Sequence, residues 1–162
     1  PAALEQLGLY VALQAGGVRS AWADTHRVAD LQLAGDPCQL SLDLQLAAYR
    51  TLIDAVSLLL KCEPGQLVVR ARCFRKHEQR GIVMIVSLLD RHSALSAATS
   101  ALANDRLAGR TLAFGGSFHC RNNRLIMILM ESAATTRRES ADDVSMESGH
   151  SPAVWDGRQA QA

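Results

Sequence analysis

The sequence predicts an α+β fold, a two-layer sandwich in which helices pack on one face of a mixed, largely antiparallel sheet. Residues 42–61 repeat apolar side chains at helical spacing, and two strand-like segments follow them as a hairpin. A second helix-like segment and a second hairpin then repeat this order. A chain of 162 residues, 48% hydrophobic and 20% charged, is long enough to bury a substantial core.

The first half of the chain predicts a helix, a strand and a second helix. Residues 1–17 have apolar side chains along one face and end at a double glycine, which predicts an amphipathic helix. Residues 27–33 alternate in hydrophobicity before Gly35-Asp36-Pro37, which indicates a strand and a turn.

The helix over residues 42–61 is the clearest prediction. Ser41 is its candidate N-cap, the charges of Asp43 and Lys61 suit its two ends, and Pro64-Gly65 ends it. Its predicted buried face consists of Leu42, Leu46, Tyr49, Leu52, Ile53, Val56, Leu59 and Leu60.

The second half predicts two hairpins around a helix. Residues 66–74 alternate apolar and charged side chains, and residues 81–89 form a continuous apolar run typical of a central strand, covered on both faces or facing a large core. A polar turn, 76–80, joins them. The pattern over 93–110 favours a helix that Asn104-Asp105 could interrupt, followed by a turn at Gly115-Gly116 and strands at 117–120 and 124–130 around residues 121–123.

Residues 49–62, YRTLIDAVSLLLKC, resemble a helix often written YRIxQEALxNAxKHA. It bears the N box of bacterial sensor histidine kinases of the nitrate-sensor and hexose-phosphate-sensor type. In that family the helix lines the ATP site of a domain shared with Hsp90, gyrase and MutL, which implies a Bergerat-type ATPase-like fold. The resemblance places the family's carboxylate on Asp54. Its metal-binding asparagine falls on Leu58, which has no ligand atom.

Two further segments extend this resemblance over roughly residues 1–131. Residues 1–13, with the pattern Pro-x-x-Leu-x-x-Leu-Gly-Leu-x-x-Ala-Leu, are similar to the family's segment that leaves the dimerisation helices, so a phosphorylatable histidine is expected upstream of Pro1. Residues 107–118 resemble the family's last helix and its Leu-Gly-Gly-x-Leu turn. The implied organisation is a helical segment from the dimerisation region (1–26), an ATPase-like domain (27–131) and a tail (132–162).

The nucleotide motifs of the family are altered in this sequence. Asp90 stands where the resemblance puts the adenine-binding aspartate, but His92 and Ala94 replace both glycines of the Asp-x-Gly-x-Gly turn, where a side chain would crowd the nucleotide. Residues 95–101 are helix-prone and replace a glycine-rich lid. Phosphoryl transfer needs positioned phosphates and a metal ion, so these losses point to a non-catalytic relative.

The resemblance therefore implies an ATPase-like domain of a two-component sensor histidine kinase, degenerate in ATP binding and acting in signal transduction through conformational or protein–protein contacts. The alternative is an active catalytic domain that binds ATP through Asp54 and Asp90, with Asp54 as a degenerate general base, and phosphorylates an upstream histidine. We expect no metal ligands and no cofactor, and ATP with magnesium only if the site is retained. Asp54 could face a partly apolar pocket or lie on the helix surface.

A third hypothesis is a pure interaction module. Its basic hairpin would bind a response regulator or another kinase, and the alternative is that these side chains are simply the solvated face of the hairpin. The upstream dimerisation helices of the same protein are the other expected partner. The basic side chains of the hairpin are Arg70, Arg72, Arg75, Lys76 and Arg80.

Composition limits the kinds of binding partner and the cellular location that we expect for this chain. A net charge of +1 and an aromatic content of 4% give no indication of nucleic-acid binding. Since no apolar run of membrane length is present, we expect no membrane contact by this piece and a cytoplasmic location. The chain begins with proline, which suggests a piece of a longer protein, and an anchor in the bacterial inner membrane upstream is compatible with this.

The remaining candidate residues favour structural roles. Cys38, Cys62, Cys73 and Cys120 lack CxxC or zinc-site spacing, which favours buried or half-buried reduced thiols. His77, His92 and His119 lack partners at a catalytic spacing. Residues 132–162 are polar and without periodicity, which predicts a flexible tail with Trp155 as a weak site for a partner.

Overall fold

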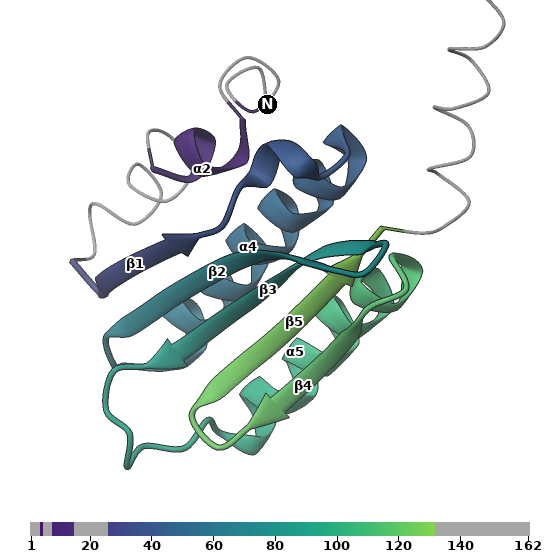
Figure 1. Ribbon diagram of the computed structural model, residues 1–162. Helices are drawn as coiled ribbons and strands as arrows, with labels where there is room; N and C mark the ends of the chain where they lie inside the picture. Colours follow the sequence, from purple (N-terminus) through teal and green to yellow (C-terminus); the bar gives the residue numbers. More distant parts are fainter. Residues whose placement is uncertain (1–3, 5–7, 15–25, 132–162) are drawn as a thin grey trace, which may run out of the picture. The chain divides into compact units, whose positions relative to one another are not determined.

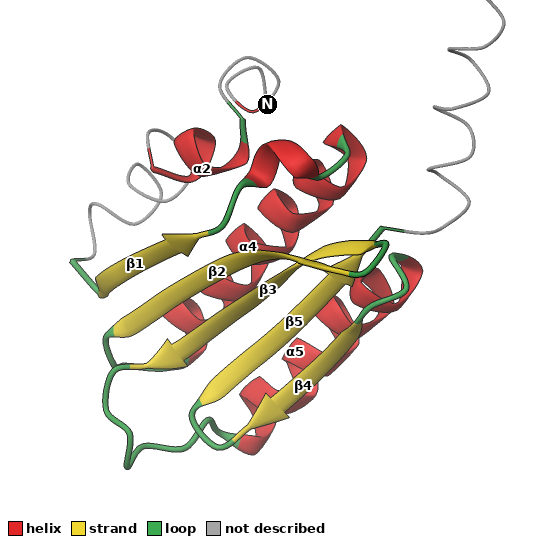
Figure 2. Ribbon diagram, in the orientation of Figure 1, coloured by secondary structure: helices red, strands yellow, loops and turns green. Residues whose placement is uncertain are grey.

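The computed structural model describes residues 4, 8–14 and 26–131, all within Pro1–Ser132, the first of two units of the chain. The assignments for the tail, with Trp155, and for the rest of residues 1–26 lie outside these residues. The described part is a five-stranded sheet in the order β1-β2-β3-β5-β4, with two long helices on one face (Figure 1). Figure 2 shows the same two layers. The predicted α+β sandwich is confirmed.

The sheet is mixed and largely antiparallel, as predicted: β1 runs parallel to β2, and the pairs β2–β3, β3–β5 and β4–β5 are antiparallel. None of the helices within the described ranges combines the length and apolar character needed to span a bilayer. In chain order the elements are α2 (Leu9–Ala12), β1 (Val28–Ala34), the 3-10 helix η3 (Pro37–Gln39), α4 (Leu42–Cys62), β2 (Leu67–Lys76), β3 (Gln79–Leu88), α5 (Ala97–Ala113), β4 (Ser117–Arg121) and β5 (Arg124–Met130).

Helix α4 has the predicted ends but a partly different buried face. Ser41 is the N-cap, since its Oγ accepts a hydrogen bond of 3.4 Å from the backbone N–H of Leu44. Leu42, predicted to be buried, is 52% exposed. The apolar face was placed wrongly at this end because alanines let the helix lie close to the sheet and to α5, and their small side chains weaken the apolar pattern. The buried residues of α4 are Leu44, Ala47, Ala48, Thr51, Leu52, Ala55, Val56, Leu58 and Leu59.

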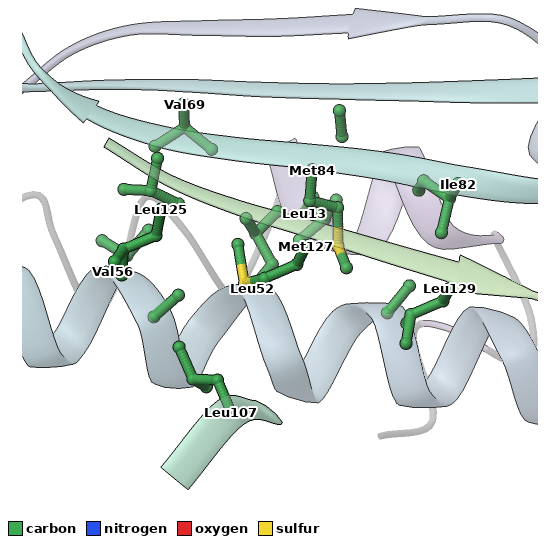
Figure 3. Close-up of a cluster of buried hydrophobic side chains, with 14 of the residues drawn as sticks. Leu13, Leu52, Val56, Val69, Ile82, Met84, Leu107, Leu125, Met127 and Leu129 are labelled. Atoms are coloured by element: carbon green, nitrogen blue, oxygen red, sulfur yellow. The ribbon is translucent and has the colours of Figure 1, made fainter. Parts of the chain in front are cut away.

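The core lies between α4 and the inner face of the sheet. In Figure 3, Leu52 and Val56 of α4 lie among inner-face side chains of β2, β3 and β5, such as Val69, Met84 and Leu125. Each such leucine or valine contributes roughly 1.5–3 kcal/mol by its removal from water. Strand β3 is central, as predicted. Of the two predicted surroundings, the structure shows a strand that faces one large core, not a strand covered on both faces.

The two hairpins have tight turns. Strands β2 and β3 extend through most of the predicted polar turn 76–80, so that only His77 and Glu78 remain between them, and His77 has φ 56°. Asn122, between β4 and β5, has φ 44°. Positive φ at a central turn residue matches the twist of the paired strands. Helix α5 starts at Ala97 rather than at residue 93 and continues through Asn104-Asp105, whose side chains are exposed.

The first helix is shorter than predicted. Gly8 has φ 78°, a conformation outside the helical region, so it interrupts the predicted continuous helix before α2. The described side chains still reach the same core as α4: Leu4, Leu9 and Leu13 are buried. Val11, one of the apolar residues of this segment, is 43% exposed.

Gly116 should be the glycine least able to accept a side chain. A Cβ there would lie 1.8 Å from the carbonyl oxygen of Ile128, whereas a Cβ at Gly109 in α5 would meet nothing within 4 Å. We expect Gly116→Ala to lower the free energy of unfolding by about 2 kcal/mol or more. The matched control Gly109→Ala should raise it by roughly 0.5–1 kcal/mol, since alanine favours a helix interior. Urea unfolding measures both, and equal effects would contradict this account.

Thr51 should be replaceable by valine with a gain in stability. Its Oγ1 is the buried side-chain polar atom without a hydrogen-bond partner among the described residues. Valine keeps the shape and removes the unsatisfied hydroxyl, so Thr51→Val should raise the free energy of unfolding by about 1 kcal/mol. Thermal and urea unfolding test this. Loss of stability would mean that the hydroxyl has a partner, such as a buried water.

Candidate functional site

Asp54 lies on the surface of α4, toward α5. Its side chain is 51% exposed. Its Oδ2 lies 2.6 Å from Nη1 of Arg110, so the two side chains form an ion pair across the two helices. An exposed pair of this kind is typically worth up to about 1 kcal/mol. Of the two alternatives raised by the sequence, the structure shows the surface carboxylate. Arg110 therefore binds one of the two carboxylate oxygens of Asp54.

Leu58 follows Asp54 by one helical turn and is 5% exposed. Its hydrocarbon side chain packs in the core, so this position offers neither a ligand atom nor an opening toward one. Within the described ranges, no three His, Cys, Asp or Glu side chains are grouped as they would be around a metal ion.

Asp90 organises the loop that follows β3. Oδ1 accepts a 2.9 Å hydrogen bond from the backbone N–H of His92, and Oδ2 accepts a 2.7 Å bond from Oγ of Ser93. These bonds hold the pKa of the Asp90 carboxyl below its ordinary value. The arrangement is an Asx-type turn, in which a short carboxylate takes the place of a backbone acceptor. Both carboxylate oxygens therefore hold the loop together.

The structure does not bring Asp54 and Asp90 together. Asp90 lies beside the end of α4, because the neighbouring Leu89 N–H donates to the carbonyl of Gln66 over 2.7 Å. Asp54 lies eight residues before Cys62 at that end, which is roughly 12 Å along the helix at 1.5 Å per residue. No hydrogen bond or ion pair within the described part of the chain connects the two carboxylates.

Sequence reasoning missed the buried carboxylate of Glu63, which is 8% exposed. Its Oε1 accepts 2.9 Å and 2.6 Å hydrogen bonds, from the backbone N–H of Ser96 and from Oγ1 of Thr99. Ser96 is the N-cap of α5 and accepts from the N–H of Thr99 over 3.1 Å. The pattern Ser96-x-x-Thr99 at a helix start, together with a lone glutamate after α4, was the available signal. We call Glu63, Ser96 and Thr99 the α5 cap cluster.

The α5 cap cluster stabilises the ionised form of Glu63. Burial by itself would raise the pKa of Glu63, but the hydrogen bonds from Thr99 and Ser96 outweigh it and hold the pKa below its ordinary value. A carboxylate at a helix N-terminus also interacts favourably with the helix dipole. The N-terminus of α5 thus already holds an anion supplied by the chain itself.

The side chain of Arg27 binds the backbone of the turn that follows α4. Its Nη1 donates to the carbonyl of Leu60 over 2.7 Å, and Nη2 donates to the carbonyl of Gly65 over 2.9 Å and to the carbonyl of Glu63. These carbonyls belong to the last turn of α4 and the loop after it, where a cation is stabilising. Arg27 therefore holds the backbone from which the Glu63 side chain reaches α5.

The predicted basic hairpin does not form one basic face. Arg70 and Arg72 share a sheet face with Lys76, but Arg75 and Arg80 pair with each other on the opposite face. The reason is the two-residue period of a strand, which sends neighbouring side chains to opposite sides. Arg80 also donates to the carbonyl of Gln39 over 3.1 Å. The prediction that these side chains form a single basic face was therefore wrong.

A cavity of about 210 Å³ lies at the far end of the sheet from Asp90. Next to it, Oη of Tyr10 lies 3.1 Å from Sγ of the buried Cys73 and donates to the carbonyl of Ala34. Burial is the main cause that raises the pKa of both Tyr10 and Cys73. None of the predicted nucleotide-site residues lines this cavity, whose walls are Gly35, Asp36, Gln39, Leu40, Cys73, Phe74 and Arg75.

The other candidate residues are scattered. His77, His92 and His119 are all exposed and lie at a hairpin turn, in a loop and on β4. All four cysteines are free, as expected for thiols without partners. Cys38 and Cys62 are exposed, however, so the expectation of buried or half-buried thiols was wrong for these two; it holds for Cys73 and Cys120.

The sequence comparisons with known proteins find no match. No protein-family model matches the chain, and no curated protein matches it. Similar solved structures include three nucleotide-free forms of the catalytic domain of histidine kinase ThkA, with sequence identities of 10%, 10% and 9% and TM-scores of 0.40, 0.40 and 0.41. Each alignment covers 70% of this chain and 87%, 88% and 86% of the other chain, respectively.

Glu63→Gln should destabilise the protein in a pH-dependent manner. At neutral pH the loss of charge-assisted hydrogen bonds should lower the free energy of unfolding by roughly 1–2 kcal/mol. Because the folded pKa lies below the unfolded value of about 4.3, the stabilisation is complete above that value and is lost as the pH falls through the folded pKa. Urea unfolding between neutral and acid pH measures the difference between the two proteins.

The matched control is Glu78→Gln, because Glu78 is exposed in the β2–β3 turn and has no part in the α5 cap cluster. It should change stability by less than about 0.5 kcal/mol at neutral pH. A cost of Glu63→Gln that stays constant down to acid pH, or that equals the cost of Glu78→Gln, would refute the assigned role of the Glu63 charge.

Proposed function

We propose that this chain is an ATPase-like domain of a bacterial two-component sensor histidine kinase that has lost nucleotide binding and acts in signalling through protein contacts. Three sequence segments match the family in the family's order, and the chain folds as an α+β sandwich with helices on one face of a mixed sheet. The site residues argue against retained phosphoryl transfer.

The observation that carries the proposal is the α5 cap cluster. A helix N-terminus is the backbone feature best suited to bind a phosphate, because its free N–H groups and its dipole both favour an anion. Here the N-cap of α5, Ser96, follows Asp90 by six residues, and the carboxylate of Glu63 occupies that end of the helix. A phosphate would have to displace a buried, doubly hydrogen-bonded carboxylate and would meet its negative charge.

The residues at the other nucleotide positions do not fit a metal-bound nucleotide. Leu58 has only hydrocarbon where the family resemblance requires a metal ligand, and Asp54 is paired with Arg110. The connection from β3 to α5 consists of residues 89–96, with no glycine, so it offers no backbone cradle for phosphates. Magnesium prefers oxygen ligands, and a single ion-paired carboxylate is a poor site for it. We derive no chemical step through ATP.

A domain without nucleotide chemistry would act by binding. We propose that its partners are a response regulator or the dimerisation helices upstream in the same protein, on the cytoplasmic side of the membrane. The described residues of the first segment support such a connection, because Leu4, Leu9 and Leu13 pack into the domain core. A displacement upstream would then be transmitted to α4, since the backbone N–H of Leu9 donates to Gln45 over 3.2 Å.

The full chain should show no thermal shift with ATP or ADP, with or without magnesium, up to millimolar concentration. A ligand that binds only the folded state at 100-fold excess over its Kd stabilises by about 2.7 kcal/mol, on the order of 10 °C for a domain of about 100 residues. Differential scanning fluorimetry measures the midpoint. A rise in melting temperature that disappears in Asp90→Asn would overturn the degenerate reading and favour the active alternative. An ATP-dependent rise that remains in Asp90→Asn and Asp54→Asn would place binding elsewhere.

A further inference from the structure

The sheet has a second face that no described element covers. Figure 2 shows α4 and α5 on one face of the sheet, and we call the opposite face the outer face. By the two-residue period of a strand, it carries the residues that alternate with the core residues of β2 and β3, of which Val68 and Ser87 are also buried. The strand register sets its composition row by row. One row is Gln32, Arg70, Ile85, Ile126 and His119, the next is Ala34, Arg72, Val83, Ile128 and Ser117, and a third is Asp30, Val68, Ser87, Arg124 and Arg121.

The centre of the outer face is apolar. Val83 pairs with Ile128 and Ile85 pairs with Ile126, so four β-branched side chains of β3 and β5 lie next to one another. All four are partly exposed. Adjacent apolar side chains that remain partly in water at the middle of a face, rather than singly at its edge, mark an interaction surface.

The two sides of this centre are cationic. Arg70 and Arg72 lie on β2 at one side, Arg121 lies on β4 at the other side, and Arg124 lies next to Arg121 on β5, at one end of the apolar strip. Arg72, Arg121 and Arg124 have no carboxylate partner among the described residues, and Arg70 donates to Gln32 over 2.8 Å. The carboxylate on the outer positions of these strands is Asp30, which accepts from Gln32 over 2.5 Å. The outer face thus combines an apolar strip with two arginine rims.

The spacing of the rims matches an α-helix. Three strand spacings separate β2 from β4, which is about 14 Å at 4.8 Å per strand. A helix with its side chains is about 10–12 Å wide, so one lying along β3 and β5 would fit between the arginines. Its apolar stripe would cover Val83, Ile85, Ile126 and Ile128. Glutamates or aspartates on its two flanks would reach the guanidinium groups, which bind carboxylates in a fork geometry.

We propose that the outer face docks an amphipathic helix of a partner protein, with an apolar stripe and acidic residues along both flanks. Charge selects this occupant, because a second copy of the same face would oppose arginine to arginine. Arginine and apolar side chains are also typical of interface centres, where lysine is depleted. The inference is independent of nucleotide binding, so either result of the ATP titration leaves it unchanged.

The test uses the full chain and a fluorescein-labelled peptide of about 18 residues, roughly 27 Å long when helical. The peptide has leucine and isoleucine at i, i+3, i+4 and i+7 and glutamates on both flanks, and its control has lysine at every glutamate position. We expect saturable binding of the acidic peptide by fluorescence anisotropy, weakened by salt. NMR methyl shifts of Val83, Ile85, Ile126 and Ile128 should change on binding.

Arg72→Glu combined with Arg124→Glu reverses one charge on the β2 rim and the charge at the end of the apolar strip, and it should weaken binding by at least about tenfold. Arg106→Glu is the matched control, because Arg106 is exposed on α5, on the other side of the molecule from the outer face. It should leave the affinity within about twofold. Circular dichroism and thermal unfolding check that each variant is folded.

Several outcomes would overturn the proposal. They are the absence of saturable binding, equal affinity for the lysine peptide, or methyl changes confined to the helix side of the sheet. Preferential binding to phosphatidylserine–phosphatidylcholine vesicles would assign the outer face to a membrane. A dimer of the full chain in sedimentation that Arg72→Glu with Arg124→Glu abolishes would assign it to a second copy.

Discussion

The turn at the end of α4 is the constraint on which the rest of the structure depends. The backbone carbonyl of Glu63 accepts from Arg27 at the start of β1, and its side chain accepts from Ser96 and Thr99 at the start of α5. One residue therefore joins a helix end, a strand start and a second helix start that are distant in the sequence. Its charge is buried, and a buried charge is stabilising only while its hydrogen bonds are complete. The two helices must therefore keep their relative positions on the sheet.

This arrangement also decides what the inner layer can do. The backbone feature that would recognise a phosphate, the N-terminus of α5, is present, but the carboxylate of Glu63 already accepts hydrogen bonds there. A second carboxylate, that of Asp54, lies at the surface and is paired across the same two helices with Arg110. Both interactions join α4 to α5 and engage carboxylate oxygens in contacts within the layer. These contacts within the inner layer are the structural support for our proposal that the domain has lost nucleotide binding.

The sequence predicted the elements better than the contacts between them. Strand β5 was predicted with its observed bounds, and α4 was predicted to within one residue, because both depend on local periodicity and caps. Glu63 was missed because its partners are more than thirty residues away, and the only signal in the sequence, the pattern Ser96-x-x-Thr99, does not say which carboxylate binds there. The start of α5 was misplaced for a related reason. Ser93 is as suitable an N-cap as Ser96, and the alanines around them favour a helix at either start.

The basic hairpin shows the limit of charge patterning most clearly. Composition groups Arg70, Arg72, Arg75 and Arg80 together, but the strand period divides them between two faces with different surroundings. On the inner side, Arg27 and Arg80 donate to main-chain carbonyls and so contribute to the fold.

On the outer face, Arg72, Arg121 and Arg124 have no such contacts among the described residues, although they flank four partly exposed apolar side chains. Arginine side chains that make no hydrogen bond or ion pair among the described residues contribute little to the stability of the isolated domain. Their energetic value arises only when a partner supplies carboxylates and covers the strip. Because Glu63 and Asp54 are engaged in contacts within the inner layer, we propose the opposite face of the same sheet as the surface that binds a partner.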